Sequence, residues 1–223
     1  MSCYPRPPLL VFLKGVIIMS CVLAQAAAHG AEIPDFSGHL SPTTPQGEQI
    51  AVLAGGCFWG VDAVYKHIKG VSKVVSGYSG GERATASYAA VGTGTTGHAE
   101  SVSITYDPAK VSYAQLLKVF FSVAHNPTEL NRQGPDRGTQ YRSAIFYAND
   151  EQKQIALAYI EQLNQAGVFP APIVTQVAPL KAFYPAEDYH QNYLTLHPDQ
   201  PYIVIHDLPK LQQLRKQFQD IYR

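Results

Sequence analysis

The order of apolar segments predicts an α/β (α+β) protein. We expect a two-layer sandwich on a split βαβ (ferredoxin-like) core with extra helices and long loops. Strand-like and helix-like segments follow one another as β-α-β-β-α-β. In that arrangement an antiparallel sheet carries its helices on one face. No internal repeat or low-complexity tract appears, so we expect one domain over residues 48–223.

The individual elements are predicted from the period of the apolar residues and from the turn residues that bound them. We expect strands at 49–54, 71–78, 100–106, 142–147 and 173–178. We expect helices at 58–68, 113–121, 150–164, 186–195 and 208–221. Two long loops remain, at 79–97 and 125–140, and loops of that length in a compact domain are typical of functional segments.

The N-terminal residues differ in composition from the rest. Two basic residues precede an apolar run at 15–24 that is too short to span a bilayer, and an alanine-rich stretch follows. We therefore expect residues 1–30 to be a cleaved signal peptide, and the protein to be exported, to the periplasm if the source is Gram-negative. A membrane anchor, or a lipoprotein signal ending at Cys21, is the alternative. Residues 31–47, rich in proline and polar residues, are expected to form an extended arm.

Charge and motif content exclude several classes of function. The formal net charge is zero and there is no run of lysine or arginine, which argues against nucleic acid or an anionic membrane as a partner. The chain has no CxxC, HExxH or EF-hand pattern, and no GxGxxG or Walker pattern after a strand. We therefore expect no bound metal or nucleotide cofactor, and we expect a monomer.

The most informative segment is Gly55-Gly56-Cys57-Phe58-Trp59-Gly60, where a strand is expected to turn into a helix. Unpaired N–H groups and the positive end of the helix dipole favour the thiolate there, so we expect an activated Cys57. It is the only cysteine outside the first 21 residues. After signal cleavage it has no disulfide partner within the chain, which favours a reactive thiol over a structural one.

Three further segments hold polar residues of chemical interest. Glu100 follows a glycine-rich loop and shares the strand face of Val102, so its carboxyl group is expected to point inward, although most glutamates are solvated. Burial raises the pKa of a carboxylic acid and makes it a proton donor near neutral pH. The segments 134–143 and 183–191 hold polar, aromatic and histidine residues, and the acidic pair of the latter has an ordinary explanation as a helix cap.

Four motifs occur together in one order: GGCFWG at 55–60, TGHAE at 96–100, GTQYRS at 138–143 and YPAEDYHQ at 184–191. On these motifs the chain resembles the A-type peptide-methionine sulfoxide reductases, which reduce the S-epimer of methionine sulfoxide. The family fold is a two-layer sandwich on a split βαβ core, in agreement with the order of elements above.

The resemblance implies a role for each matching residue. Cys57 corresponds to the nucleophile and Glu100 to the acid that protonates the sulfoxide oxygen. The expected substrate-binding residues are of three kinds. Phe58 and Trp59 form the pocket for the methyl group, and Tyr88 and Tyr141 bind the sulfoxide oxygen. Asp136 belongs to the site, and His190 with its neighbour Tyr189 borders the pocket.

The resemblance also implies a sulfenic acid at Cys57 after each turnover. Many relatives carry further cysteines near the C-terminus that resolve it, but no cysteine follows Cys57 here. We therefore expect an external reductant: a thioredoxin-like or glutaredoxin-like protein or a small thiol. The expected substrates are protein-bound or free methionine sulfoxide, and the expected role is the repair of oxidised exported proteins.

Two other classes of function stay open on the sequence. The first is a cysteine hydrolase or acyl transferase that uses Cys57 with His98 or His190. The second is a thiol sensor without catalytic activity.

Overall fold

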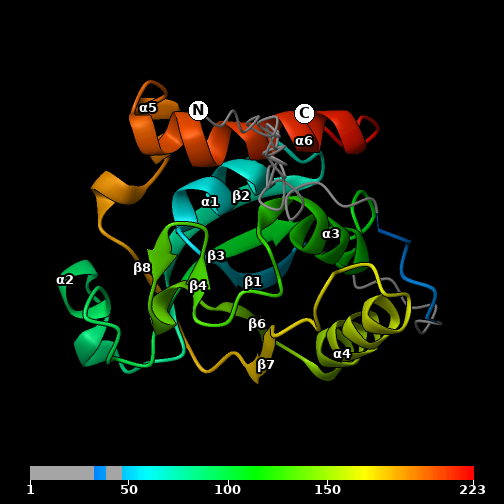
Figure 1. Cartoon of the computed structure of the whole chain (residues 1–223), viewed down its shortest axis with the longest axis horizontal. Coiled ribbons are helices and arrows are strands. Elements are labelled where there is room, and N and C mark those ends of the chain that lie inside the picture. The colour runs from blue at the N-terminus through cyan, green and yellow to red at the C-terminus, as the bar shows by residue number, and fades with distance from the viewer. Residues whose placement is uncertain (1–32, 39–46) are drawn as a thin grey trace, which may run out of the picture.

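A computed structural model describes residues 33–38 and 47–223, and shows one mixed sheet with its helices (Figure 1). The strands of the large sheet are β1 (Gln49–Gly55), β2 (Val71–Ser79), β3 (Ala99–Tyr106), β6 (Ser143–Tyr147), β7 (Gln176–Pro179) and β8 (Phe183–Pro185). Their order is β7-β6-β1-β3-β2-β8. All neighbours are antiparallel except the parallel pair β6 and β7. The central order β6-β1-β3-β2 is the expected split βαβ core, extended by one short strand at each edge.

The helices and short turns connect these strands. The α-helices are α1 (Phe58–Lys66), α2 (Tyr88–Val91), α3 (Tyr113–Val119), α4 (Asp150–Gln165), α5 (Tyr193–Leu196) and α6 (Leu208–Gln217). Three short 3₁₀ turns are η1 (Arg83–Thr85), η3 (Thr139–Tyr141) and η4 (Asp188–His190). Two π-helical turns are η2 (Phe120–Ala124) and η5 (Ile203–Asp207). A two-stranded hairpin, β4 (Arg132–Gln133) with β5 (Asp136–Arg137), lies between η2 and η3.

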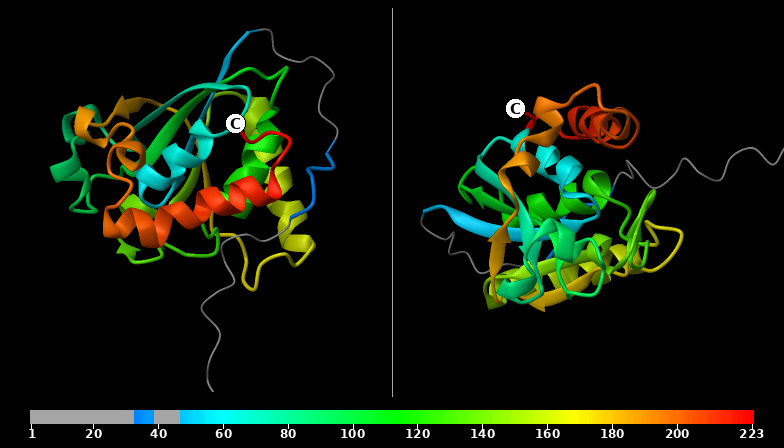
Figure 2. Two further views of the ribbon diagram at one scale, coloured as in Figure 1. Left: turned by 90° about the horizontal axis from the view of Figure 1, so that it is seen from above. Right: turned by 90° about the vertical axis from the view of Figure 1, so that its left-hand side faces the viewer.

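The main core lies between the sheet and its helices. Leu53 and Val102 on the central strands belong to it together with side chains of α1, α3 and α4, and all of these are buried. Alternate residues such as Val52 and Phe146 form a smaller cluster on the opposite face of the sheet. Figure 2 shows the helices α1 and α6 as successive coils over the sheet, so the C-terminal helix lies outside α1.

Three predicted elements differ from the structure. The helix expected at 186–195 is wrong: η4 and α5 are separated by Gln191 and Asn192, and Asn192 has a left-handed φ of 56°. There the Gln191 side chain hydrogen-bonds both the N–H and the carbonyl of Ser76 on β2, which ties the segment to the sheet instead of a helix. The strand expected at 173–178 forms only from Gln176, because the N–H of Val174 donates to a loop carbonyl instead of the sheet.

The third difference concerns the last helix. The sequence predicts this helix at 208–221, but α6 ends at Gln217, and helical backbone begins earlier, in the π turn η5. After α6 the chain turns back to the end of α1, where Ile221 accepts a hydrogen bond from Lys69 and Tyr222 bridges to Ile68. The loop expected at 79–97 contains η1 and α2, and the loop expected at 125–140 contains the β4–β5 hairpin and the start of η3.

Residues 33–38 of the expected arm lie against α3 and α4. Ile33 is buried, and the hydroxyl of Tyr159 on α4 donates to the Pro34 carbonyl at 2.6 Å. Asp35 pairs with Lys118 of α3 at 2.7 Å. The expected signal peptide, 1–30, lies outside the described residues. Within the part of the chain that the structure describes, no helix is long and apolar enough to cross a membrane.

Candidate active site

The turn between β1 and α1 places Cys57 at the first turn of a helix. β1 ends at Gly55, and Cys57 is the N-cap of α1. Gly56 has a φ of +87°, and a Cβ built there would lie 2.5 Å from Cβ of Gln133. Only glycine fits a left-handed position against another residue's side chain, so Gly56 of the motif is explained by the shape of this turn.

A cavity of about 260 Å³ opens beside Cys57. Its walls come from the turn, α2, β3, the β4–β5 hairpin, η3 and the segment before η5. The lining residues are Cys57, Phe58, Trp59, Tyr88, Glu100, Asp136, Tyr141, Gln200 and Tyr202. Seven of the nine residues to which the resemblance assigns a role thus meet around one space, although they come from segments far apart in the sequence. The other two are Tyr189 and His190.

Glu100 supplies a buried acid at this cavity. It is only 3% exposed, and its Oε2 accepts a hydrogen bond of 3.1 Å from the backbone N–H of Phe58. Burial disfavours the charged form and raises the pKa of Glu100 to about 8; the bond from Phe58 lowers it, and the nearby Asp136 charge adds to the rise. The carboxyl group is therefore mostly protonated at pH 7 and available as a proton donor.

The thiol of Cys57 differs from its sequence-based expectation. Its pKa is raised, chiefly by burial and then by the charges of Glu100 and Asp207, whereas a bond from the Trp59 N–H and the charge of Lys210 lower it. The expectation of a thiolate stabilised by the helix terminus alone is wrong, because desolvation outweighs the helix N–H groups. When Glu100 is protonated it carries no charge, so it no longer contributes to the rise of the Cys57 pKa.

Three tyrosine hydroxyl groups and the carboxyl group of Asp136 also face this cavity. Burial raises the pKa of Tyr88 and of Tyr141, so both phenols keep their protons. The hydroxyl of Tyr202 donates to Oδ2 of Asp136. Burial raises the pKa of Asp136, and the bond from Tyr202 opposes that rise. Neutral phenols and a protonated carboxyl group suit an oxygen acceptor on a bound molecule.

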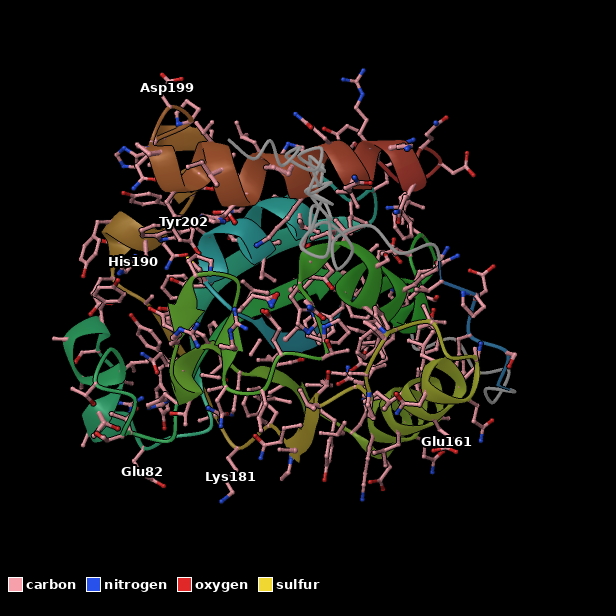
Figure 3. The ribbon with its side chains drawn as sticks, viewed as in Figure 1. Glu82, Glu161, Lys181, His190, Asp199 and Tyr202 are labelled. Carbon is pink, nitrogen blue, oxygen red and sulfur yellow. The ribbon has the colours of Figure 1, made fainter. Side chains whose placement is uncertain are left out.

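His190 lies behind the cavity wall and does not line it. Its Nδ1 accepts a hydrogen bond of 3.1 Å from the indole N–H of Trp59. Tyr193 stacks on the same indole, with ring centroids 3.7 Å apart and an interplanar angle of 7°. Figure 3 shows His190 and Tyr202 on neighbouring stretches of the C-terminal segment, close to the start of α1. Tyr189 is exposed and contacts the His190 ring. His190 therefore positions Trp59.

The two histidines of the hydrolase alternative have other partners. His98 is buried, accepts from the Gly81 N–H through Nδ1, and pairs through Nε2 with the Glu82 carbonyl at 3.0 Å. Among the hydrogen bonds of the described residues, none joins His98 or His190 to the sulfur of Cys57. Nothing in this geometry favours a hydrolase. Within residues 33–38 and 47–223, no group of three or more His, Cys, Asp or Glu side chains is arranged to hold a metal ion.

Gln200 and Tyr202 are cavity residues that the sequence did not indicate. They follow α5 in a stretch with no catalytic motif and no apolar period, so no sequence signal separated them from the rest of the C-terminal segment. The buried ion pair Asp207–Lys210, 3.0 Å long, also escaped prediction. It lies against Gly60 of α1, where an added Cβ would be 2.7 Å from the Lys210 nitrogen.

Comparisons with known proteins agree with this geometry. Residues 49–222 match the family model described as peptide methionine sulfoxide reductase. The chain is 64% identical over 176 residues to peptide methionine sulfoxide reductase MsrA 2 of Mesorhizobium japonicum, covering 79% of this chain and 90% of that protein. It is 55% identical over 190 residues to MsrA 2 of Synechocystis, covering 84% and 89%.

Solved structures show the same fold. The reduced form of Mxr1 from Saccharomyces cerevisiae is 36% identical with a TM-score of 0.64, covering 70% of this chain and 89% of that one. Methionine sulfoxide reductase A of Corynebacterium diphtheriae is 35% identical with a TM-score of 0.59, covering 69% and 77%. The chain therefore belongs to the A-type peptide methionine sulfoxide reductase family.

Proposed function

We propose that this enzyme reduces the S-epimer of methionine sulfoxide, protein-bound or free, through a sulfenic acid at Cys57 that an external thiol then reduces. The observation that carries the proposal is the meeting of a thiol, a neutral buried acid and two phenols around one small cavity. A sulfoxide is a poor electrophile until its oxygen is protonated or strongly hydrogen-bonded, so both halves of the site are needed.

In the first half-reaction the sulfoxide oxygen lies among Tyr88, Tyr141 and Glu100. The phenols donate hydrogen bonds to the oxygen and Glu100 transfers its proton to it, while the Cys57 sulfur attacks the methionine sulfur and its thiol proton returns Glu100 to the acid form. The hydroxyl group then passes from the methionine sulfur to the Cys57 sulfur as the bond between the two sulfurs breaks, which leaves a sulfenic acid on Cys57 and releases methionine. The sulfur of the substrate is reduced by two electrons and the sulfur of Cys57 is oxidised by two.

The aromatic wall is proposed to hold the methyl group of the substrate. Phe58 is buried, and Trp59 is fixed from behind by His190 and by the stacked Tyr193. Two rigid apolar rings beside the thiol give a preformed surface for a small apolar group, while the polar donors face the oxygen.

The second half-reaction is proposed to need an external thiol. No cysteine follows Cys57, and Cys57 is the only cysteine of the described residues. The reductant is therefore a thioredoxin-like or glutaredoxin-like protein or a small thiol.

A stoichiometric reaction tests the first half. The reduced enzyme is mixed with the S-epimer of methionine sulfoxide without reductant, and methionine and sulfenic acid are measured. We expect about one equivalent of each per active site, no reaction with Cys57→Ser, and no comparable burst with the R-epimer. If the S-epimer yields neither product, the proposed function is wrong.

Export is a separate proposal that rests on the composition of residues 1–30. A cleaved signal would direct the enzyme to oxidised proteins outside the cytoplasm. N-terminal sequencing of the protein recovered from a fractionated native host tests it. We expect a mature N-terminus near residue 27–31 in the exported fraction, and an intact N-terminus in the cytoplasm would contradict the proposal.

A further inference from the structure

Cys57 lines a second cavity that the proposed first half-reaction does not use. This cavity, of about 220 Å³, is bounded by the β4–β5 hairpin, η5 and the start of α6. Its lining residues are Cys57, Gln133, Gly134, Pro135, Tyr202, Ile205, His206, Pro209 and Lys210. Cys57 and Tyr202 are the residues that line both spaces.

Tyr202 forms the wall between the two cavities. Its hydroxyl donates to Asp136, and its ring meets the Trp59 ring edge-on, with centroids 5.9 Å apart and an interplanar angle of 88°. His206, one turn later on η5, also packs against the Tyr202 ring, with the two ring centroids 4.8 Å apart. These contacts hold the Tyr202 side chain in place between the two cavities, so a molecule can reach the thiol of Cys57 through either cavity.

The two cavities differ in the sign of their ionisable groups. The first is lined by two carboxyl groups, Glu100 and Asp136, and by no basic residue. The second is lined by two basic residues, His206 and Lys210, and by no acidic one. Lys210 is buried and its ammonium is held by Asp207 at 3.0 Å. Asp207 balances the charge of the Lys210 ammonium, so the second cavity differs from the first chiefly in having no carboxyl group in its lining. An anion that approaches Cys57 through the second cavity therefore avoids the two acids that line the first.

A thiol that reduces a sulfenic acid attacks as the thiolate anion. After the first half-reaction the sulfenic oxygen came from the cavity of Glu100, so the opposite side of the sulfur is left for the attacking group. We propose that the second cavity admits the reducing thiolate to Cys57, on the far side of Tyr202 from the sulfoxide. This inference rests on the sulfenic acid of the proposed function and assigns the site of its reduction.

The chemistry of this step balances without any further reagent. The thiolate sulfur forms a bond to the Cys57 sulfur, the sulfur–oxygen bond breaks, and the oxygen leaves as water with protons from the thiol and the sulfenic acid. A second thiol then attacks the mixed disulfide and releases the Cys57 thiolate. Two thiols become one disulfide, and the two electrons reach the sulfur of Cys57.

Ile205 provides a site for a test that leaves the core intact. It lines the second cavity and is 63% exposed, so a polar side chain there does not disturb packing. Ile205→Glu places a carboxylate where the thiolate must pass, and Ile205→Gln is its uncharged match. Val204→Glu is the control, because Val204 is 46% exposed on the same turn and lines neither cavity.

The sulfenic acid is generated with one equivalent of hydrogen peroxide, which makes the test independent of methionine sulfoxide. Its reduction by 2-mercaptoethanol, by mercaptoethanesulfonate and by a thioredoxin-type protein is followed in separate arms. For Ile205→Glu we expect the rate constant with small thiols to fall about tenfold, from a like charge at close range. The fall is expected to be larger for mercaptoethanesulfonate, and Ile205→Gln and Val204→Glu are expected to stay within about twofold of the wild type.

The outcomes decide between the sources of the thiol. If the rate constant of Ile205→Glu falls with the small thiols alone, a small-molecule thiol is the occupant of the second cavity. If it falls in all arms, the cavity is a path that small thiols share with a protein cysteine. An equal fall in Val204→Glu, no fall with any thiol, or a fall with the protein alone overturns the inference. Methionine release from the reduced enzyme is measured separately, so a failure of the proposed function is recognised by itself.

Discussion

The replacement Glu100→Gln is expected to weaken catalysis and to stabilise the fold at the same time. Glutamine has nearly the same shape and keeps an oxygen that accepts the hydrogen bond from Phe58. It has no acidic proton, and loss of a positioned general acid lowers the rate by about 10²- to 10⁴-fold. The wild-type rate is expected to fall as the pH rises through about 8, where Glu100 loses its proton, and the variant is expected to lack that dependence.

The gain in stability follows from the pKa of the buried acid. Glu100 has a pKa of about 8 in the fold and an ordinary value of 4.5. The stability contributed by its protonated form is complete below pH 4.5 and is lost as the pH rises through 8, because the unfolded chain releases the proton more easily. At pH 7 this loss amounts to about 3 kcal/mol of unfolding free energy. Glutamine avoids it.

Urea unfolding at several pH values measures the difference. Trp59 is the only tryptophan, so its fluorescence reports on the site directly. We expect Glu100→Gln to be about 3 kcal/mol more stable than the wild type at pH 7 and nearly equal to it near pH 4.5. Glu161→Gln, on an exposed position of α4 (Figure 3), is the control and is expected to change neither rate nor stability. A variant that is not stabilised at pH 7, or that keeps full activity, refutes the reasoning.

Three further substitutions probe the surroundings of the thiol. Tyr202→Phe removes the donor to the half-buried carboxyl group of Asp136 and is expected to lower kcat/KM about tenfold in steady-state assays; unchanged kinetics would exclude a role for this bond. Gly60→Ala would gain about 1 kcal/mol from helix propensity, but its methyl group meets the Asp207 carboxylate, so we expect a net loss of about 1–3 kcal/mol and a lower Tm; a higher Tm would contradict this. His190→Phe leaves the indole N–H without its acceptor and is expected to cost about 1–3 kcal/mol in urea unfolding, with equal stability as the contrary result.

Local patterns predicted much of the fold, and they failed where distant contacts compete with them. The alternation of 100–106 and the helical period of 150–164 both correspond to observed elements, β3 and α4. The segment 186–195 has helix-compatible residues, but Gln191 bonds to β2 and the helix does not form. Such a bond joins residues 115 positions apart, and no local period contains it.

The sequence by itself determined which side chains form the centre of the site and where they point. Cys57 lies in a turn set by its neighbouring glycines, and the inward side of Glu100 follows from the strand alternation with Val102. Both depend on residues adjacent in the chain, where covalent geometry decides side-chain direction.

The tertiary structure alone decided the state of those groups and their surroundings. Burial, with the charges of Glu100 and Asp207, raises the pKa of Cys57 against the helix N-terminus. Tyr202 divides the space at the sulfur into two cavities, of which only the first is lined by carboxyl groups, and Lys210 in the lining of the second lies 153 residues after Cys57. Desolvation and charge act through space, so they are set by which segments fold together and not by which residues are neighbours in sequence.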